Sequence, residues 1–138
     1  MRIRSLVVAA CLAVSSAAFA QAALKIDWTW KRLHQCSPVS PAIVVADIPA
    51  DTKLLEVKMV DLGFTQFNHG GGSVAHAGEP TATIPIGALK DYRGPCPMRN
   101  LYYGSDYEFT VRAVAADGKT VIAQGSSTRT YSTSLIKD

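Results

Sequence analysis

The sequence predicts an all-β, mainly antiparallel fold: a β-sandwich with little helix. Apolar residues alternate with polar ones in most apolar segments, clusters of glycine and proline separate these segments, and no segment has a convincing amphipathic helix pattern. The chain has 138 residues, of which 48% are hydrophobic and 18% charged. This length and composition suit one domain with a real core. We therefore expect residues 21–138 to form a single β domain.

The N-terminal segment that ends at Ala20 is typical of a secretory signal peptide. Arg2 and Arg4 precede an apolar run from Leu6 to Val14, and small residues follow. Cleavage after Ala22 would also satisfy the signal peptidase, so the expected boundary has two alternatives. Beyond this segment no apolar stretch approaches the ~20 residues of a membrane-spanning helix. The sequence therefore predicts a periplasmic or secreted protein with no transmembrane segment in the mature chain.

The charge of the mature chain is close to balanced. Without Arg2 and Arg4, 12 lysines and arginines stand against 11 acidic residues. Bulk charge of this size does not attract nucleic acid, so we expect no nucleic-acid partner.

Alternation at a period of two predicts the first strands. Every second residue from Leu24 to Trp30 is large and apolar, and the same pattern holds from Leu55 to Met59. Shorter strands are expected over Ala42 to Val45 and over Thr81 to Ile86. The only helical feature that we expect is a single turn at residues 86–90.

The C-terminal third predicts a hairpin and one further strand. The longest alternating run extends from Tyr107 to Ala115, and Asp117-Gly118 offers the positive φ values of a tight turn before Thr120 to Gln124 returns. A last short run covers Ser127 to Tyr131. In all, about six strands are expected. The long irregular stretches, Asp61 to Pro80 and Lys90 to Asp106, are where we expect the functional site.

The cysteine count favours a disulfide. Cys11 would leave with the signal peptide, and Cys36 and Cys96 would remain in an oxidising compartment. Two unpaired buried thiols are the alternative. A bond between these cysteines would close a loop of about sixty residues and stabilise the fold by roughly 4 kcal/mol. The chain has no Cys-x-x-Cys motif for redox catalysis.

Several short motifs occur in an order that carries a family resemblance. They are Cys36-Ser37-Pro38, Ile48-Pro49-Ala50-Asp51-Thr52-Lys53, Asp61 at a strand end, His69-Gly70-Gly71-Gly72, Tyr92-Arg93-Gly94-Pro95-Cys96-Pro97 and Tyr107-Glu108-Phe109-Thr110-Val111-Arg112-Ala113. In this order the chain resembles bacterial members of the phosphatidylethanolamine-binding protein family, also called Raf kinase inhibitor-like. The resemblance spans Cys36 to about Gln124.

The resemblance implies a large antiparallel sheet beside a smaller one. It also implies a shallow pocket for phosphate-type groups, without obligatory catalysis, rimmed by an Asp, a His and the Gly-Pro-x-Pro loop. Two positions depart from the family: Asp61-Leu62-Gly63-Phe64 replaces Asp-Pro-Asp-Ala-Pro, and Ser105 stands where a His is usual. The candidate ligand-binding residues are Asp61, His69, Gly70, Gly71, Pro95, Pro97, Ser105 and Tyr107.

The candidate residues suit anion binding by their own chemistry. Glycine N–H groups beside His69 can face an anion, and a protonated imidazole adds a charge. Alternatively, the glycines form a flexible turn and His69 is solvated. Asp61 could orient His69, accept a ligand ammonium or hydroxyl, or cap a turn. The prolines make the Gly-Pro-Cys-Pro loop rigid, and Tyr107 is expected in the core because it alternates with core residues.

These observations favour a binding protein over an enzyme. His-Gly-Gly-Gly occurs in esterase oxyanion loops, but the Gly-x-Ser-x-Gly elbow is missing, and the spacing of His69 and His76 matches no metal motif. We expect no cofactor and no metal. The predicted function is binding of a small anionic or phosphate-bearing ligand. The alternative is a fibronectin-like sandwich that binds another protein. The two long loops should meet around one cavity in the first case.

Overall fold

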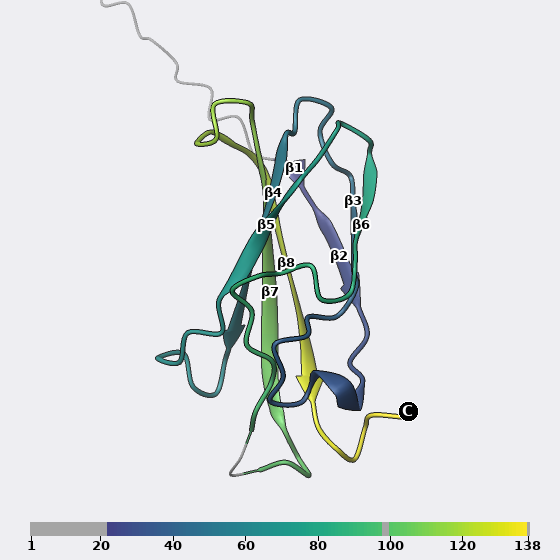
Figure 1. Ribbon diagram of the computed structural model, residues 1–138, viewed down its shortest axis with the longest axis vertical. Helices are drawn as coiled ribbons and strands as arrows, with labels where there is room; N and C mark the ends of the chain where they lie inside the picture. Colours follow the sequence, from purple (N-terminus) through teal and green to yellow (C-terminus); the bar gives the residue numbers. More distant parts are fainter. Residues whose placement is uncertain (1–21, 98–99, 138) are drawn as a thin grey trace, which may run out of the picture.

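The computed structural model describes residues 22–97 and 100–137, so the predicted signal peptide lies outside the described residues. Two β-sheets pack face to face (Figure 1). The five-stranded sheet has the order β1 (Ala22–Ala23), β8 (Val121–Tyr131), β7 (Ser105–Val114), β4 (Leu54–Asp61) and β5 (Gly71–Ala75). The three-stranded sheet has the order β2 (Lys25–Trp28), β3 (Ile43–Ala46) and β6 (Thr81–Ile84). The short 3-10 helix η1 (Arg32–His34) follows β2.

The predicted fold class is confirmed. All neighbouring strands run antiparallel except β1, which pairs with β8 in parallel, and helix is confined to η1 in the described ranges. The large sheet beside a smaller one also agrees with the expected pair of sheets.

Alternating side chains of both sheets form the core. Along β7, every second residue from Tyr107 to Ala113 is fully buried, as the period of two predicts. The aromatic rings meet edge to face between the sheets: Trp28 lies 4.9 Å from Phe109 and Trp30 lies 5.8 Å from Tyr131, measured between ring centroids. The alternation therefore identified the buried face of this strand.

The chain changes sheets at Leu24, so the strand predicted over residues 24–30 begins only at Lys25, and it ends at Trp28. The chain pairs with β8 up to Ala23, the N–H of Leu24 donates to the carbonyl of Gln124, and pairing with β3 begins at Lys25. The crossing brings the Leu24 carbonyl to 2.1 Å from where a Cβ on Gly125 would stand. Gly125 therefore permits β8 to run unbroken beneath the crossing.

The other differences from the expected strands have local causes. Residues 120–124 and 127–131 were expected as separate strands, but from Val121 onward they belong to the single strand β8. The expected irregular stretch from 61 to 80 contains β5, whose pairing with β4 begins at Gly71. Residues 86–87 form a turn rather than a helical turn over 86–90. In the hairpin, only Gly118 has a positive φ, because Asp117 instead accepts the N–H groups of Lys119 and Thr120.

Candidate functional site

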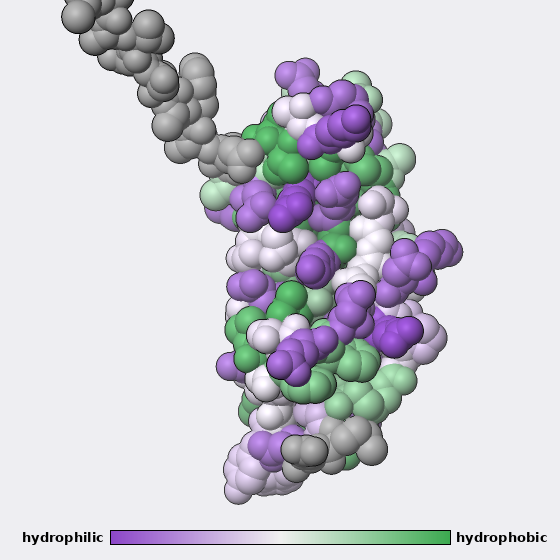
Figure 2. All heavy atoms as spheres, turned by 90° about the vertical axis from the view of Figure 1, so that its left-hand side faces the viewer, coloured by the Kyte–Doolittle hydropathy of each residue, from purple (hydrophilic) through white to green (hydrophobic). Residues whose placement is uncertain are grey.

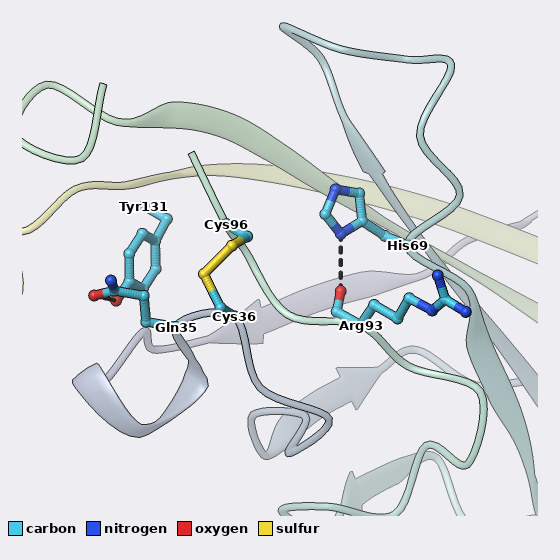
Figure 3. Close-up of a disulfide and its surroundings, with 6 residues drawn as sticks. All are labelled: Gln35, Cys36, His69, Arg93, Cys96 and Tyr131. Atoms are coloured by element: carbon cyan, nitrogen blue, oxygen red, sulfur yellow. Dashed lines mark hydrogen bonds between the residues drawn. A yellow bond between two sulfur atoms is a disulfide. The ribbon is translucent and has the colours of Figure 1, made fainter. Parts of the chain in front are cut away.

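A disulfide fixes two loops at the end of the sandwich drawn at the bottom of Figure 1. Cys36 and Cys96 are bonded, which confirms the predicted pairing (Figure 3). The backbones of the two loops also pair: the Cys36 N–H donates to the Pro95 carbonyl, and the Gly94 N–H donates to the Ser37 carbonyl. A Cβ on Gly94 would lie 2.1 Å from the carbonyl oxygen of His34, so this contact requires glycine.

The two long loops meet around one pocket. This pocket has a volume of about 440 Å³, within the range of small-ligand sites. The connection from β4 to β5 forms one wall and the segment that leads into β7 forms the other. The described lining residues are Asp61, Gly63, Phe64, Cys96, Pro97, Asn100, Gly104 and Ser105. Three predicted site residues, Asp61, Pro97 and Ser105, therefore share this pocket.

Asp61 is the centre of the hydrogen bonding at this pocket. Its Oδ1 accepts the Ser105 hydroxyl at 2.6 Å and the N–H groups of Gly63 and Phe64 at 2.8 and 3.2 Å. Asp61 therefore caps the turn after β4, one of the roles expected from the sequence. The register of β4 on β7 places Asp61 opposite Tyr107, which brings Ser105 within reach of the carboxylate.

Tyr107 lies in the core behind the pocket. Its side chain is fully buried, as expected, and its hydroxyl lies close enough to the Asp61 carboxylate to interact with it. Burial raises the pKa of Tyr107 above its usual value, and the nearby negative charge of Asp61 raises it further. The phenol therefore stays protonated and can serve only as a hydrogen-bonding group.

His69 is packed into the protein rather than solvated. Only 3% of its surface is exposed, and its ring lies edge-on to Phe67 and Tyr107. Its Nδ1 lies 2.8 Å from the carbonyl oxygen of Arg93 and donates to it, so Nδ1 carries a proton (Figure 3). The Arg93 side chain points away from the disulfide in the same view. His69 does not belong to the described lining of the 440 Å³ pocket.

The glycines after His69 allow close packing of neighbouring backbone. A Cβ on Gly70 would lie 1.9 Å from the carbonyl oxygen of Asp91, and Gly71 meets the Val57 carbonyl at the same distance. The Gly70 N–H already donates to the Asn68 side chain. Gly70 lines a separate pocket of about 420 Å³ with Asn68, Lys90, Asp91, Tyr92 and Arg93. Gly71 and Pro95 line neither of these two pockets.

Exposed aromatic side chains lie on both loops that form the pocket, and Phe64 lines it. Phe64, which lines the pocket, is 56% exposed, and Phe67 lies on the same connection. On the opposite loop Tyr103 is 75% exposed and stands edge to face with Tyr102 at 5.1 Å. Figure 2 shows an apolar patch in the lower half of the face that carries β5. The tyrosine pair is visible in the sequence as two adjacent aromatic residues within a long loop, whereas the exposure of Phe64 and Phe67 is seen only in the structure.

Metal-binding and membrane-spanning features are missing from the part of the chain that the structure describes. No three His, Cys, Asp or Glu side chains come together there as a set of metal ligands. No helix within residues 22–97 and 100–137 has the length and hydropathy needed to cross a bilayer.

Comparisons with models of known protein families, with curated proteins and with solved structures found no match. The resemblance to the phosphatidylethanolamine-binding protein family therefore stays a prediction. The arrangement of the described residues is the basis for any functional argument.

Proposed function

We propose that the protein is an exported, non-catalytic binding module that recognises another protein through the pocket end of the sandwich. The observation that carries this proposal is the group of exposed aromatic residues on both loops of one pocket. Exposed aromatic side chains are enriched at protein interfaces and often dominate their energetics. The aromatic rim is defined as Phe64, Phe67, Tyr102 and Tyr103.

The strand order supports a fibronectin-like module. With β2, β3, β4, β5, β6, β7 and β8 taken as strands A, B, C, C′, E, F and G, the sheets have the orders A-B-E and G-F-C-C′. This is the division of strands in immunoglobulin-type sandwiches, a group of folds in which loops at the two ends often bind ligands. Fold alone does not define a function, so the aromatic rim remains the main argument.

Two features support export to an oxidising compartment. The N-terminal 20 residues have the pattern of a signal peptide, and the only described cysteines form a disulfide. The disulfide also holds the base of the loop that carries Tyr102 and Tyr103, which lowers the entropy lost when a partner binds. These two observations support a periplasmic or secreted location.

The test is a comparison of partner binding by two double variants. Wild-type protein captures candidate partners from the exported fraction, and each candidate is then purified and titrated calorimetrically. Tyr102→Ser with Tyr103→Ser should weaken binding at least tenfold, because each buried aromatic anchor contributes more than about 1 kcal/mol. Lys119→Ser with Thr120→Ser, at the exposed hairpin on the opposite end, is the matched control. Equal affinities for wild type and both variants would rule out this end as the interface.

Binding of a small anion is the second candidate function, and one observation favours it. The two loops meet around one pocket and bring three predicted residues together there, as that hypothesis requires. The charge argues against it, because Asp61 is the only charged residue in the described lining and repels an anion. Inorganic phosphate titrated at pH 5.5 and pH 8 tests this candidate. It requires measurable binding that is weakened in Ser105→Ala, and no measurable binding at either pH rejects it.

A further inference from the structure

We propose that two copies of this chain pair through the free edge of β5, in an antiparallel arrangement about a two-fold axis at Val74. β5 is the last strand of the five-stranded sheet, and no strand of the described ranges lies beyond it (Figure 1). The proposal uses neither the pocket nor the aromatic rim. It therefore goes beyond the proposed function, and its test is a separate one.

The edge of β5 presents backbone groups that are free to pair. The Gly71 carbonyl accepts the Asp91 N–H, so it points away from β4. Because consecutive residues of a strand alternate in this direction, the N–H and C=O groups of Ser73 and Ala75 also point away from β4. These four groups have no hydrogen-bond partner among the described residues, and both residues are exposed. Asp91 closes the edge at Gly71, so the open part covers residues 73–75.

β5 lacks the features that protect edge strands from pairing. Charged side chains and prolines are the usual protection, and β5 contains neither. By contrast, β6 lies between Pro80 and Pro85 at one edge of the smaller sheet, and β2, at the other edge, carries Lys25 and Asp27. The edge of β5 is therefore suited to pairing with another strand.

The open edge is complementary to a second copy of itself. With a two-fold axis at Val74, Ser73 of each copy lies opposite Ala75 of the other copy, and each such pair exchanges two N–H···O=C hydrogen bonds. The two Val74 side chains then face each other on the inner side of the sheet, because Val74 pairs with the buried Leu55 within its own copy. Val74 is half-buried against the core, so this contact covers the rest of its side chain.

Charges at the two ends of the edge are also complementary. Lys90 and Arg93 are exposed beside the start of β5, with one acid, Asp91, between them. Glu79 is exposed just beyond the other end of the strand. An antiparallel pair brings the start of each strand next to the end of the other. Glu79 of each copy therefore approaches the basic segment of the second copy.

The arrangement has two consequences for the assembly. Because the paired strands are antiparallel, the two aromatic rims lie at opposite ends of the dimer. Because only residues 73–75 of each copy are open, the interface is small, and the dimer is of the weak kind found at the low end of interface size.

Sedimentation equilibrium of the exported protein, from about 10 µM to about 1 mM, tests the proposal. The weight-average mass should rise toward twice the monomer mass across this range. Ser73→Pro removes an N–H that faces the second copy and leaves the pairing with β4 intact, because this N–H is not part of that pairing. The dimer loses two hydrogen bonds, so its association constant should fall at least tenfold. Ser73→Ala keeps the N–H and should associate like wild type.

A cysteine cross-link tests the same geometry without proline. The Cα atoms of a non-hydrogen-bonded antiparallel pair are about 4.5 Å apart, within disulfide range. Val74→Cys should therefore form a disulfide-linked dimer in air, and Thr83→Cys, exposed on β6, should not.

Four outcomes would overturn the proposal. Two concern association: wild-type protein that stays monomeric at every concentration, and a Ser73→Pro variant with an unchanged melting temperature that associates like wild type. The other two concern the cross-link: no linked dimer for Val74→Cys, and equal amounts of linked dimer for both cysteine variants.

Discussion

At the scale of single residues, His34 is the clearest buried titratable group. Its side chain is 1% exposed and lies edge-on to Trp30, and its Nδ1 accepts the Lys31 N–H at 2.9 Å. Its Nε2 is buried without a hydrogen-bond partner in the described structure. Burial lowers the pKa of His34 to about 4, and the positive charge of Lys31 adds to this effect. The folded protein therefore holds His34 neutral.

His34 should make stability depend on pH. Between pH 6.5 and about 4, the unfolded state binds a proton at this position and the folded state does not. The free energy of unfolding should therefore decrease as the pH falls through this window, whereas the contribution is complete above pH 6.5. His34→Asn keeps an acceptor for the Lys31 N–H but cannot titrate. Urea denaturation from pH 4 to pH 7 should show that the free energy of unfolding depends less on pH in this variant than in wild type. The same pH dependence in both proteins would contradict its assignment to His34.

Gly70 provides a test of close backbone packing. It has a φ of +65°, and a Cβ would lie 1.9 Å from the Asp91 carbonyl, whereas Gly118 has a φ of +70° with nothing within 4 Å. Gly118→Ala should therefore lose only the roughly 1–2 kcal/mol of the left-handed conformation. Gly70→Ala should lose a further ~1–3 kcal/mol, because the added methyl group overlaps the neighbouring backbone. If chemical denaturation shows the same loss in free energy of unfolding for both variants, the backbone of residues 90–91 does not exclude a methyl group at position 70.

Two of the predicted site residues lie together in the structure. Asp61 and Ser105 were both selected from the sequence, and the register of β4 on β7 brings them together. The environment of His69 could not be predicted, because its acceptor is a carbonyl 24 residues away. A histidine before three glycines is compatible with an anion site and also with a buried residue at the start of a closely packed strand. Only tertiary contacts distinguish these two arrangements.

At the scale of elements, the disulfide connects the loop after η1 to the loop before β7. The two cysteines are 60 residues apart in sequence, so the bond removes much conformational freedom from the unfolded chain. Backbone hydrogen bonds between the same loops show that the bond lies within an ordered contact.

Removal of the disulfide should reduce stability strongly. Cys36→Ser with Cys96→Ser should lower the free energy of unfolding by about 4 kcal/mol, measured by denaturant titration. Thiol titration of denatured, unreduced wild-type protein provides the control and should find no free thiol. A double variant as stable as wild type would contradict the stabilising role of the bond.

Strand predictions failed where glycine replaces the alternating side chains. β5 was expected as an irregular loop because Gly71 and Gly72 carry no apolar pattern, yet both pair with β4. Gly125 similarly interrupted the apolar alternation of β8, so two strands were expected there. In the structure this glycine leaves room for the backbone of Leu24, which crosses β8 at this position. Period-two alternation reports a buried face, so it cannot identify strand residues whose role is close backbone contact.

At the scale of the whole molecule, the two ends of the sandwich differ in chemistry. The end with the disulfide carries the pocket and the aromatic rim, and the opposite end carries the polar hairpin around Asp117 and Gly118 (Figure 1). The sequence predicted the all-β class, and the two long loops in which the candidate site was expected meet around one pocket. It did not show that their aromatic residues would face outward together, since this depends on how both loops fold back over the strand ends.

The central claim is that the end with the aromatic rim binds a protein, and site-specific photo-cross-linking tests it most directly. A photoreactive amino acid replaces Tyr103 in one version of the full chain and the exposed Lys119 in another. Each version is irradiated in the compartment to which the protein is exported. We expect a defined protein adduct at position 103 that disappears when Phe64→Ser is added, and none at position 119. Adducts at position 119 alone, or equal adducts at both positions, would contradict the claim.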